Sequence, residues 1–183
     1  LCIPFIMTGK DTDYDRIFEM FYNYRFDETE TYLNEKKSSP ENPYPYYAFY
    51  SYIKIRSQLA NAEYDILSES ADSVIKKYRP IYEQYLKNNP EDADVLFYYT
   101  VLLAGKMRIY LNKMDYFAIL KEAPKILSNK ITIDLYKNKH AADMDFGTGS
   151  FDYYVSVVGR NFGLGNLMSN QQSDGIRDLW NAY

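Results

Sequence analysis

The chain has 183 residues and a formal net charge of −4, so it carries no basic footprint for nucleic acid or an anionic membrane. This length suffices for one sizeable core or for a run of helix pairs, and the single cysteine, Cys2, excludes an internal disulfide. The 21 tyrosines suit the half-buried positions of a thin helical layer, because a tyrosine can bury its ring and keep its hydroxyl wet. A genome that tolerates tyrosine in place of leucine would explain the same composition.

The first ten residues, LCIPFIMTGK, form an apolar run that is followed directly by the polar DTDYD. This pattern resembles the second half of a secretory signal without its basic front, and the alternative is an apolar segment that caps the first helix. The run is too short to cross a membrane. We therefore expect residues 1–10 to be a signal remnant or a hydrophobic N-terminal segment.

The first third of the chain predicts three helices. Apolar residues recur at helical spacing over residues 13–25, and a mostly polar helix is expected over residues 28–37 with Asp27 as its N-cap. Three prolines make residues 38–45 a connector. The next helix, residues 46–61, is apolar nearly all round, which predicts a position in the middle of the assembly.

Residues 71–88 carry an apolar stripe at steps of three and four, which predicts an amphipathic helix. The stripe keeps its phase across Pro80, so we expect a kink there and not a break. Residues 61–70 are expected to form a loop or a frayed turn, with Ser70 as the N-cap. The helix should stop at Asn88-Asn89-Pro90, where Glu91 and Asp92 can open the next one.

The second half predicts helices over residues 93–111, 116–127, 131–144 and 174–183. Asp115 should cap the second of these, and Pro124 should interrupt it. Five glycines between residues 147 and 165 bracket an aromatic segment, and residues 160–173 suggest a long loop. Because no stretch shows the alternation typical of strands, we expect an all-α fold.

Two prolines set a repeated spacing. Pro40 and Pro90 lie fifty residues apart, and the same offsets from each reach the apolar residues Tyr46, Phe49 and Ile53 and then Leu96, Tyr99 and Leu103. The spacing Tyr78, Tyr82, Tyr85, Pro90 resembles the second helix of a tetratricopeptide repeat, although these units exceed the family's length of about 34 residues and place tyrosines where it has small residues. The resemblance implies antiparallel helix pairs stacked as a tetratricopeptide-like right-handed superhelix with irregular repeats, in a single helical-repeat domain over residues 11–183.

A second resemblance concerns the C-terminal region. The segment FGTGSFDYYVSVV, a loop and SDGIRDLWNA are similar to a unit in exported bacterial tetratricopeptide-like proteins of uncharacterised role. It implies a scaffold or binding role in an exported or periplasmic protein, with a cytoplasmic location as the alternative. The final apolar helix is unlike a polar capping helix, so we expect the array to continue beyond Tyr183.

Catalytic and metal-binding patterns are weak. Gly147-Thr148-Gly149 has neither a preceding strand nor the Gly-Lys-Ser/Thr of a phosphate loop, so its glycines are better explained by close helix packing. His140 with Asp143 and Asp145 could offer metal ligands, but a solvated helix end explains the same residues. A single histidine and a single cysteine far apart suggest no triad. We therefore expect no enzyme activity, no metal and no cofactor.

The aromatic residues are the functional candidates. The first helix of each pair lines the concave face of such an array, where ligands dock. The expected partner-binding residues on this face are Tyr47, Tyr50, Lys54, Tyr98, Tyr99 and Arg108. The leading hypothesis is a non-enzymatic interaction or scaffold module that binds a protein or peptide segment, with neither nucleic acid nor a membrane span. The alternative is a small-ligand carrier of a cell-envelope transport system, with an enclosed pocket near the glycine-rich segment.

Overall fold

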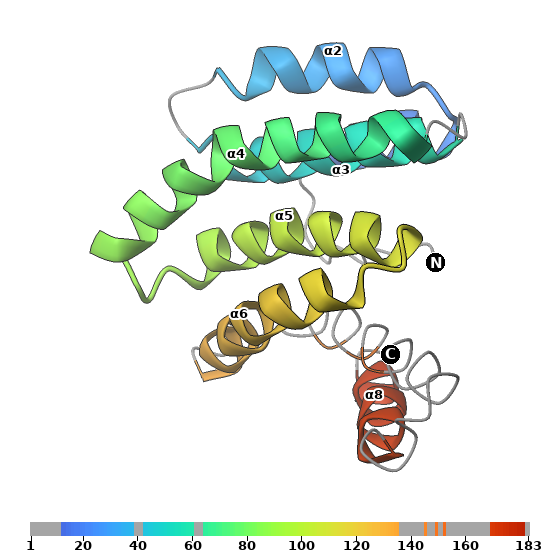
Figure 1. The fold of residues 1–183 in the computed structure, drawn as a ribbon. Helices are drawn as coiled ribbons and strands as arrows, with labels where there is room; N and C mark the ends of the chain where they lie inside the picture. The colour runs from blue at the N-terminus through green and yellow to red at the C-terminus, as the bar shows by residue number, and fades with distance from the viewer. Residues whose placement is uncertain are drawn as a thin grey trace. The chain divides into compact units, whose positions relative to one another are not determined.

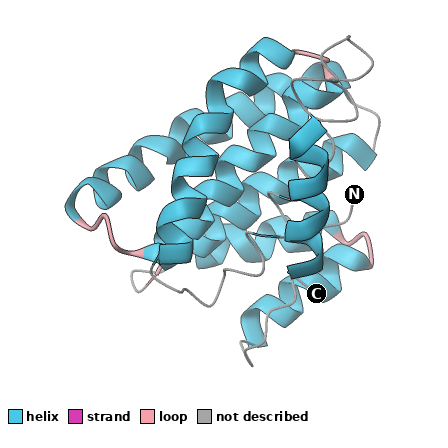
Figure 2. Ribbon diagram, turned by 90° about the horizontal axis from the view of Figure 1, so that it is seen from below, coloured by secondary structure: helices cyan, strands magenta, loops and turns pink. Residues whose placement is uncertain are grey.

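The computed structural model describes residues 12–38, 42–60, 64–135, 145, 149, 152 and 169–181. These residues form helices and no strand, so the prediction of an all-α fold is confirmed for them (Figure 2). The helices are α1 (Thr12–Tyr22), α2 (Phe26–Lys36), α3 (Tyr44–Ala60), α4 (Tyr64–Asn88), α5 (Ala93–Asn112), α6 (Tyr116–Leu135) and α8 (Ser169–Asn181) (Figure 1). The described residues fall into two compact units, one ending at Asn129 and the other beginning at Lys130.

The turn between α1 and α2 is tighter than the sequence predicts. Helix α1 ends at Tyr22, three residues before the expected end, because Tyr24 adopts a left-handed conformation with φ of 58°. The Tyr24 amide donates to the Phe21 carbonyl at 3.0 Å and the Arg25 amide to the Met20 carbonyl at 2.9 Å. These two bonds satisfy carbonyls that a helix end leaves without partners.

Helix α2 begins at Phe26, so the prediction of Asp27 as N-cap is wrong. Arg25 occupies that position, and its side chain makes no capping bond. Its carbonyl instead accepts the amide and the hydroxyl of Thr29, at 3.0 and 2.8 Å. Phe26 packs edge-on against Phe21 at 5.7 Å, which favours its inclusion in the helix.

Two aspartates cap the later helices as predicted. The Asp92 carboxylate accepts the Val95 amide at 3.1 Å at the start of α5, and the Asp115 carboxylate accepts the Ala118 amide at 3.0 Å at the start of α6. Before Asp115, Met114 takes a left-handed conformation with φ of 55°. The α5–α6 turn therefore repeats the local geometry of the α1–α2 turn.

Three helices contain a proline, and each begins earlier or ends later than the sequence predicts. Helix α3 begins at Tyr44 because Pro45 is tolerated in a first turn, where no intrahelical donor is needed. Helix α4 begins at Tyr64 and runs unbroken through Pro80, and Figure 1 shows its ribbon changing direction, as the predicted kink requires. Helix α6 likewise continues through Pro124 to Leu135, so the two helices expected over residues 116–144 are one helix at least to that residue. Pro80 and Pro124 are exposed, so the backbone carbonyls that they leave without a hydrogen bond can face water.

Helices α3, α4 and α5 pack against one another and form the core of the first unit. Tyrosine rings pack between α3 and α4. The ring centroids of Tyr44 and Tyr85 lie 4.8 Å apart, and Tyr47 stacks on Tyr78 with their ring centroids 4.4 Å apart. Because later residues of α3 meet earlier residues of α4, these two helices run in opposite directions. Behind them Tyr82 is fully buried, donates its hydroxyl to the Tyr44 carbonyl and stacks on Tyr99 at 5.4 Å.

In the second unit, Gly149 lies directly against α8. A Cβ atom at Gly149 would be 2.7 Å from the Gly175 carbonyl oxygen and 2.9 Å from the Leu179 amide nitrogen, so only glycine fits there. This contact confirms the packing role expected of that glycine. Helix α8 begins at Ser169, five residues before the expected start, so part of the predicted loop is helical. His140 and most of the glycine-rich segment, residues 147–165, lie outside the described residues. No helix in the described part is long and apolar enough to span a membrane.

Candidate functional site

Helix α3 places three of the predicted partner-binding residues on one side. Tyr47, Tyr50 and Lys54 follow one another at helical spacing, and all three are half-buried. The Tyr47 ring stacks on Tyr78 of α4 with an interplanar angle of 17°, while Tyr50 meets the same Tyr78 ring edge-on at 6.3 Å. The predicted residues of α3 therefore face both neighbouring helices, with Tyr50 and Lys54 nearest α2.

Lys37 provides the cation closest to the Tyr50 ring. It is the C-cap residue of α2, where a positive charge is favoured by the helix dipole. Its ammonium lies 3.5 Å from the centroid of the Tyr50 ring and 5.9 Å from that of Tyr78. At these distances the ring face attracts the cation.

Two more lysines and one glutamate complete the cluster. The Lys54 ammonium pairs with the Glu30 carboxylate at 2.6 Å, and Glu30 also accepts the Tyr50 hydroxyl at 3.3 Å. The exposed Lys77 of α4 places its ammonium 5.4 Å from the Tyr78 ring. Three ammonium groups and one carboxylate leave a local formal charge of +2. We call this cluster the lysine–tyrosine face: Lys37, Lys54, Lys77, Tyr50, Tyr78 and Glu30.

The electrostatics of the face favour an incoming anion. Burial lowers the pKa of Lys37 below its ordinary value, and the nearby Lys77 ammonium lowers it further. Glu30 opposes this lowering, and the Lys54 ammonium adds the smallest contribution to it. Burial raises the pKa of Tyr78 to about 12 and also raises the pKa of Tyr50. Both phenols therefore stay neutral at pH 7, and the Lys37 cation is incompletely compensated.

The three predicted residues of α5 do not lie on this face. Tyr98 and Tyr99 are only 4% and 1% exposed, so the prediction that they contact a partner is wrong. Both α3 and α4 pack on α5, which covers the first half of α5 on nearly every side. Arg108 lies further along α5, and its side chain is outside the described part of the structure.

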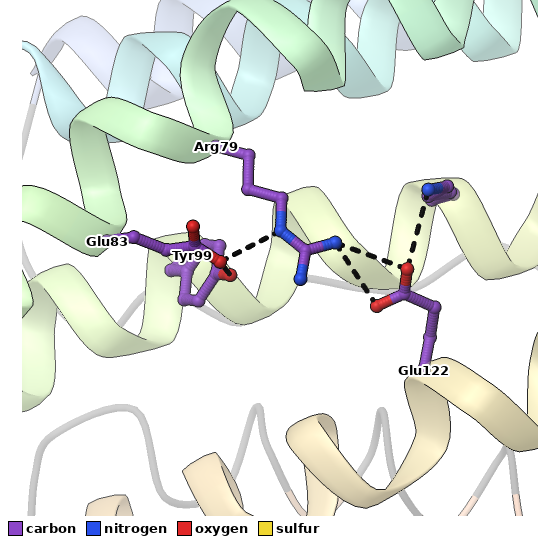
Figure 3. A network of polar contacts seen from close by, with 5 residues as sticks. Arg79, Glu83, Tyr99 and Glu122 are labelled. Carbon is purple, nitrogen blue, oxygen red and sulfur yellow. Dashed lines mark hydrogen bonds and ion pairs between the residues drawn. The ribbon is translucent and has the colours of Figure 1, made fainter.

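Tyr99 instead belongs to a polar network that joins α4, α5 and α6 (Figure 3). The Arg79 guanidinium donates to Glu83 at 2.9 Å and to Glu122 at 3.2 Å, and the Tyr99 hydroxyl donates to Glu83 at 2.7 Å. Lys106 also pairs with Glu122, at 3.4 Å. Two cations and two carboxylates balance one another, so this network cross-links helices and offers no unbalanced charge to a ligand.

The sequence alone does not predict four of the six residues of the lysine–tyrosine face. Lys37, Lys77 and Glu30 come from polar stretches of α2 and α4, and the sequence predicts Tyr78 as a packing residue of the repeat-like helix over residues 71–88. The available signal was the pair of lysines that ends α2 and the pair that precedes Tyr78. Packing of three helices brings these residues together, and no local spacing contains that information.

The described residues contain no group of three side chains that could hold a metal ion. Of the predicted His140 cluster, Asp145 is described, whereas His140 and Asp143 lie outside the described residues. The glycine-rich segment, where a small-ligand carrier would have its pocket, also lies largely outside. Comparisons of the chain with known protein families, curated proteins and solved structures find no match.

Proposed function

We propose that the chain is a non-enzymatic interaction module that binds a segment of a partner protein at the lysine–tyrosine face. One observation carries the proposal: the half-buried Lys37 ammonium rests on the Tyr50 ring, and no described carboxylate pairs with it. Tyrosines beside a basic side chain are typical of interface positions that contribute most of a binding energy. The chain would bind through this face and perform no chemistry on its partner.

The proposal includes a tetratricopeptide-like array of antiparallel pairs with irregular repeats. Helices α1 and α2 each have 11 residues and are joined by a three-residue turn, and α5 and α6 are joined by a turn of the same length. The opposite directions of α3 and α4 support the same arrangement. The 25-residue α4 supports irregular units. As part of the same proposal, the resemblance to exported tetratricopeptide-like proteins assigns this role to the cell envelope.

Selection from a displayed library of random peptides tests the binding function. We expect the wild-type protein to enrich peptides that lose binding on Tyr50→Ala or Lys37→Ala. Lys87→Ala is the matched control, because Lys87 is an exposed lysine at the far end of α4. Circular dichroism and the Tm of each variant establish that the fold is retained.

Two results would contradict the proposal. One is that folded wild-type protein enriches no peptide. The other is that enriched peptides bind Tyr50→Ala and Lys37→Ala as tightly as wild type.

A further inference from the structure

The lysine–tyrosine face already binds one carboxylate, that of Glu30. This carboxylate lies 2.6 Å from the Lys54 ammonium and accepts the Tyr50 hydroxyl at 3.3 Å. Charge-assisted hydrogen bonds of this kind are about twice as strong as neutral ones. Glu30 thus shows which chemical group this surface accommodates.

Beside Glu30, two cations lack such a partner. Lys37 and Lys77 both approach the Tyr78 ring, at 5.9 and 5.4 Å, and the Lys77 charge lowers the pKa of Lys37. No described carboxylate lies within ion-pair distance of either ammonium. An anion placed between them would relieve their repulsion. Folding has already removed water from part of Lys37, so this residue adds less desolvation cost when the anion binds.

We infer that the partner segment is acidic and places an aspartate or glutamate carboxylate between the Lys37 and Lys77 ammonium groups, beside the ring of Tyr50. Tyr78 is only 2% exposed and belongs to the core beneath this surface. This inference rests on the proposed function, because it specifies the chemistry of the segment bound at that face. The Lys54–Glu30 pair lies next to the incoming carboxylate and is not itself displaced.

A discrete carboxylate fits better than a nucleic acid or a membrane. Both of those polyanions are bound through many phosphate contacts spread over a basic surface. The whole chain has a net charge of −4, and the face combines only three lysines with one glutamate. A small, half-buried cationic site matches a single acidic side chain presented by a peptide.

The arrangement predicts effects of opposite sign for two substitutions. Lys37→Met keeps the apolar stem but removes the cation on the ring, so the affinity for an acidic segment should fall by at least about tenfold. Glu30→Gln removes a competing negative charge and frees the Lys54 ammonium, so the affinity should rise several-fold. A face that bound only through apolar contact with its rings would show neither effect.

Fluorescence anisotropy of the full chain with a labelled peptide of alternating glutamate and serine tests the inference, and the same peptide with glutamine in place of glutamate is the matched probe. We expect the acidic peptide to bind more tightly by at least about tenfold. Lys37→Met should weaken this preference, Glu30→Gln should increase it and Lys87→Met should leave it unchanged.

Equal affinity for the two peptides, or a loss on Glu30→Gln like that on Lys37→Met, would overturn the inference. So would tighter binding of phosphatidylserine vesicles or oligothymidylate than of the acidic peptide. If neutral peptides selected from the displayed library still depend on Tyr50, the interaction module stands and only its acidic ligand is excluded.

Discussion

The Lys37 ammonium lies 3.5 Å from the centroid of the Tyr50 ring, although Lys37 ends α2 and Tyr50 lies in the middle of α3. The Tyr50 hydroxyl reaches back to Glu30, also in α2, at 3.3 Å. One tyrosine thus connects to α2 through both its ring and its hydroxyl. These two contacts hold the Tyr50 ring next to the Lys37 ammonium, the cation that we infer to bind an acidic segment.

Affinity for the acidic peptide should depend on pH through Lys37. Because binding favours the ammonium form, affinity should be constant below the lowered pKa of free Lys37 and fall as the pH rises through it. Anisotropy titrations from about pH 6 to about pH 10 measure this fall. The charged and titratable groups that face Lys37 are Lys54, Lys77, Glu30, Tyr50 and Tyr78.

In Lys37→Met the fall should move to higher pH, where the other lysines lose their charge. An unchanged pH profile in that variant would show that Lys37 does not bind the peptide.

Asp13 should make the N-terminal helices sensitive to acid. Its carboxylate accepts the Lys36 ammonium at 2.6 Å and the Tyr32 hydroxyl at 2.7 Å, which lower its pKa below 3.8. A lowered pKa contributes stability above the unfolded-state value, and this contribution is lost as the pH falls through the folded-state value. Asp13→Asn should therefore reduce the free energy of unfolding by about 1 kcal/mol at pH 7, since the groups are partly exposed.

Urea unfolding of wild type and Asp13→Asn at pH 7 and below about pH 3 measures this difference. The two proteins should converge in acid, and Glu91→Gln, in an exposed loop, should behave as wild type. A difference that is the same at both pH values would refute the role of the Asp13 charge.

The buried pair Thr100 and Asn129 should behave non-additively. The Asn129 side-chain amide donates to the Thr100 hydroxyl at 2.9 Å, and both residues are less than 5% exposed. Thr100→Val leaves that amide unpaired and should cost about 1–3 kcal/mol, whereas the double variant with Asn129→Leu removes both polar groups and should recover much of the loss. Urea unfolding of the two single variants and the double variant gives the coupling energy, and simple additivity would contradict this account.

Met114 offers a stabilising substitution. It holds a φ of 55° and is 71% exposed, so glycine would relieve the left-handed strain with little loss of packing. We expect Met114→Gly to raise the Tm, with a gain of up to about 1 kcal/mol. Lys121→Gly at an exposed helical position is the control and should cost about 1 kcal/mol. A Tm that falls equally in both variants would show that the turn gains nothing from glycine.

Local chemistry made parts of the fold predictable. Asp92 and Asp115 could be identified as N-caps because a capping carboxylate acts within three residues of its own position. The end of α1 and the start of α2 differ from the prediction because Tyr24 adopts a left-handed conformation. This conformation is uncommon for residues other than glycine, and a tyrosine in the sequence does not signal it. The start of α4 differs from the prediction because Ser70 suggests an N-cap, although residues 61–70 contain no glycine or proline to stop a helix.

Most of the candidate site depends on long-range packing. Tyr50 and Lys54 could be selected from one helix, but Lys37 and Lys77 join them only because α2 and α4 both pack on α3. Tyr98 and Tyr99 were misplaced although α5 is apolar on nearly every side in its first half. Residues 46–61 have the same pattern and correctly predict a central helix, because a helix that is apolar on nearly every side is covered by its neighbours. The same rule applied to α5 places Tyr98 and Tyr99 in the core.

The pKa of the Lys37 ammonium, followed by NMR of its ε-methylene group with and without the acidic peptide, tests the central claim most directly. The account predicts a pKa below the ordinary value of 10.5 in the free protein, because burial and the neighbouring lysines disfavour the charge. Binding of the acidic peptide should raise it, and the glutamine peptide should not. A Lys37 pKa that stays unchanged at saturating acidic peptide would contradict the assignment of this face as the binding site.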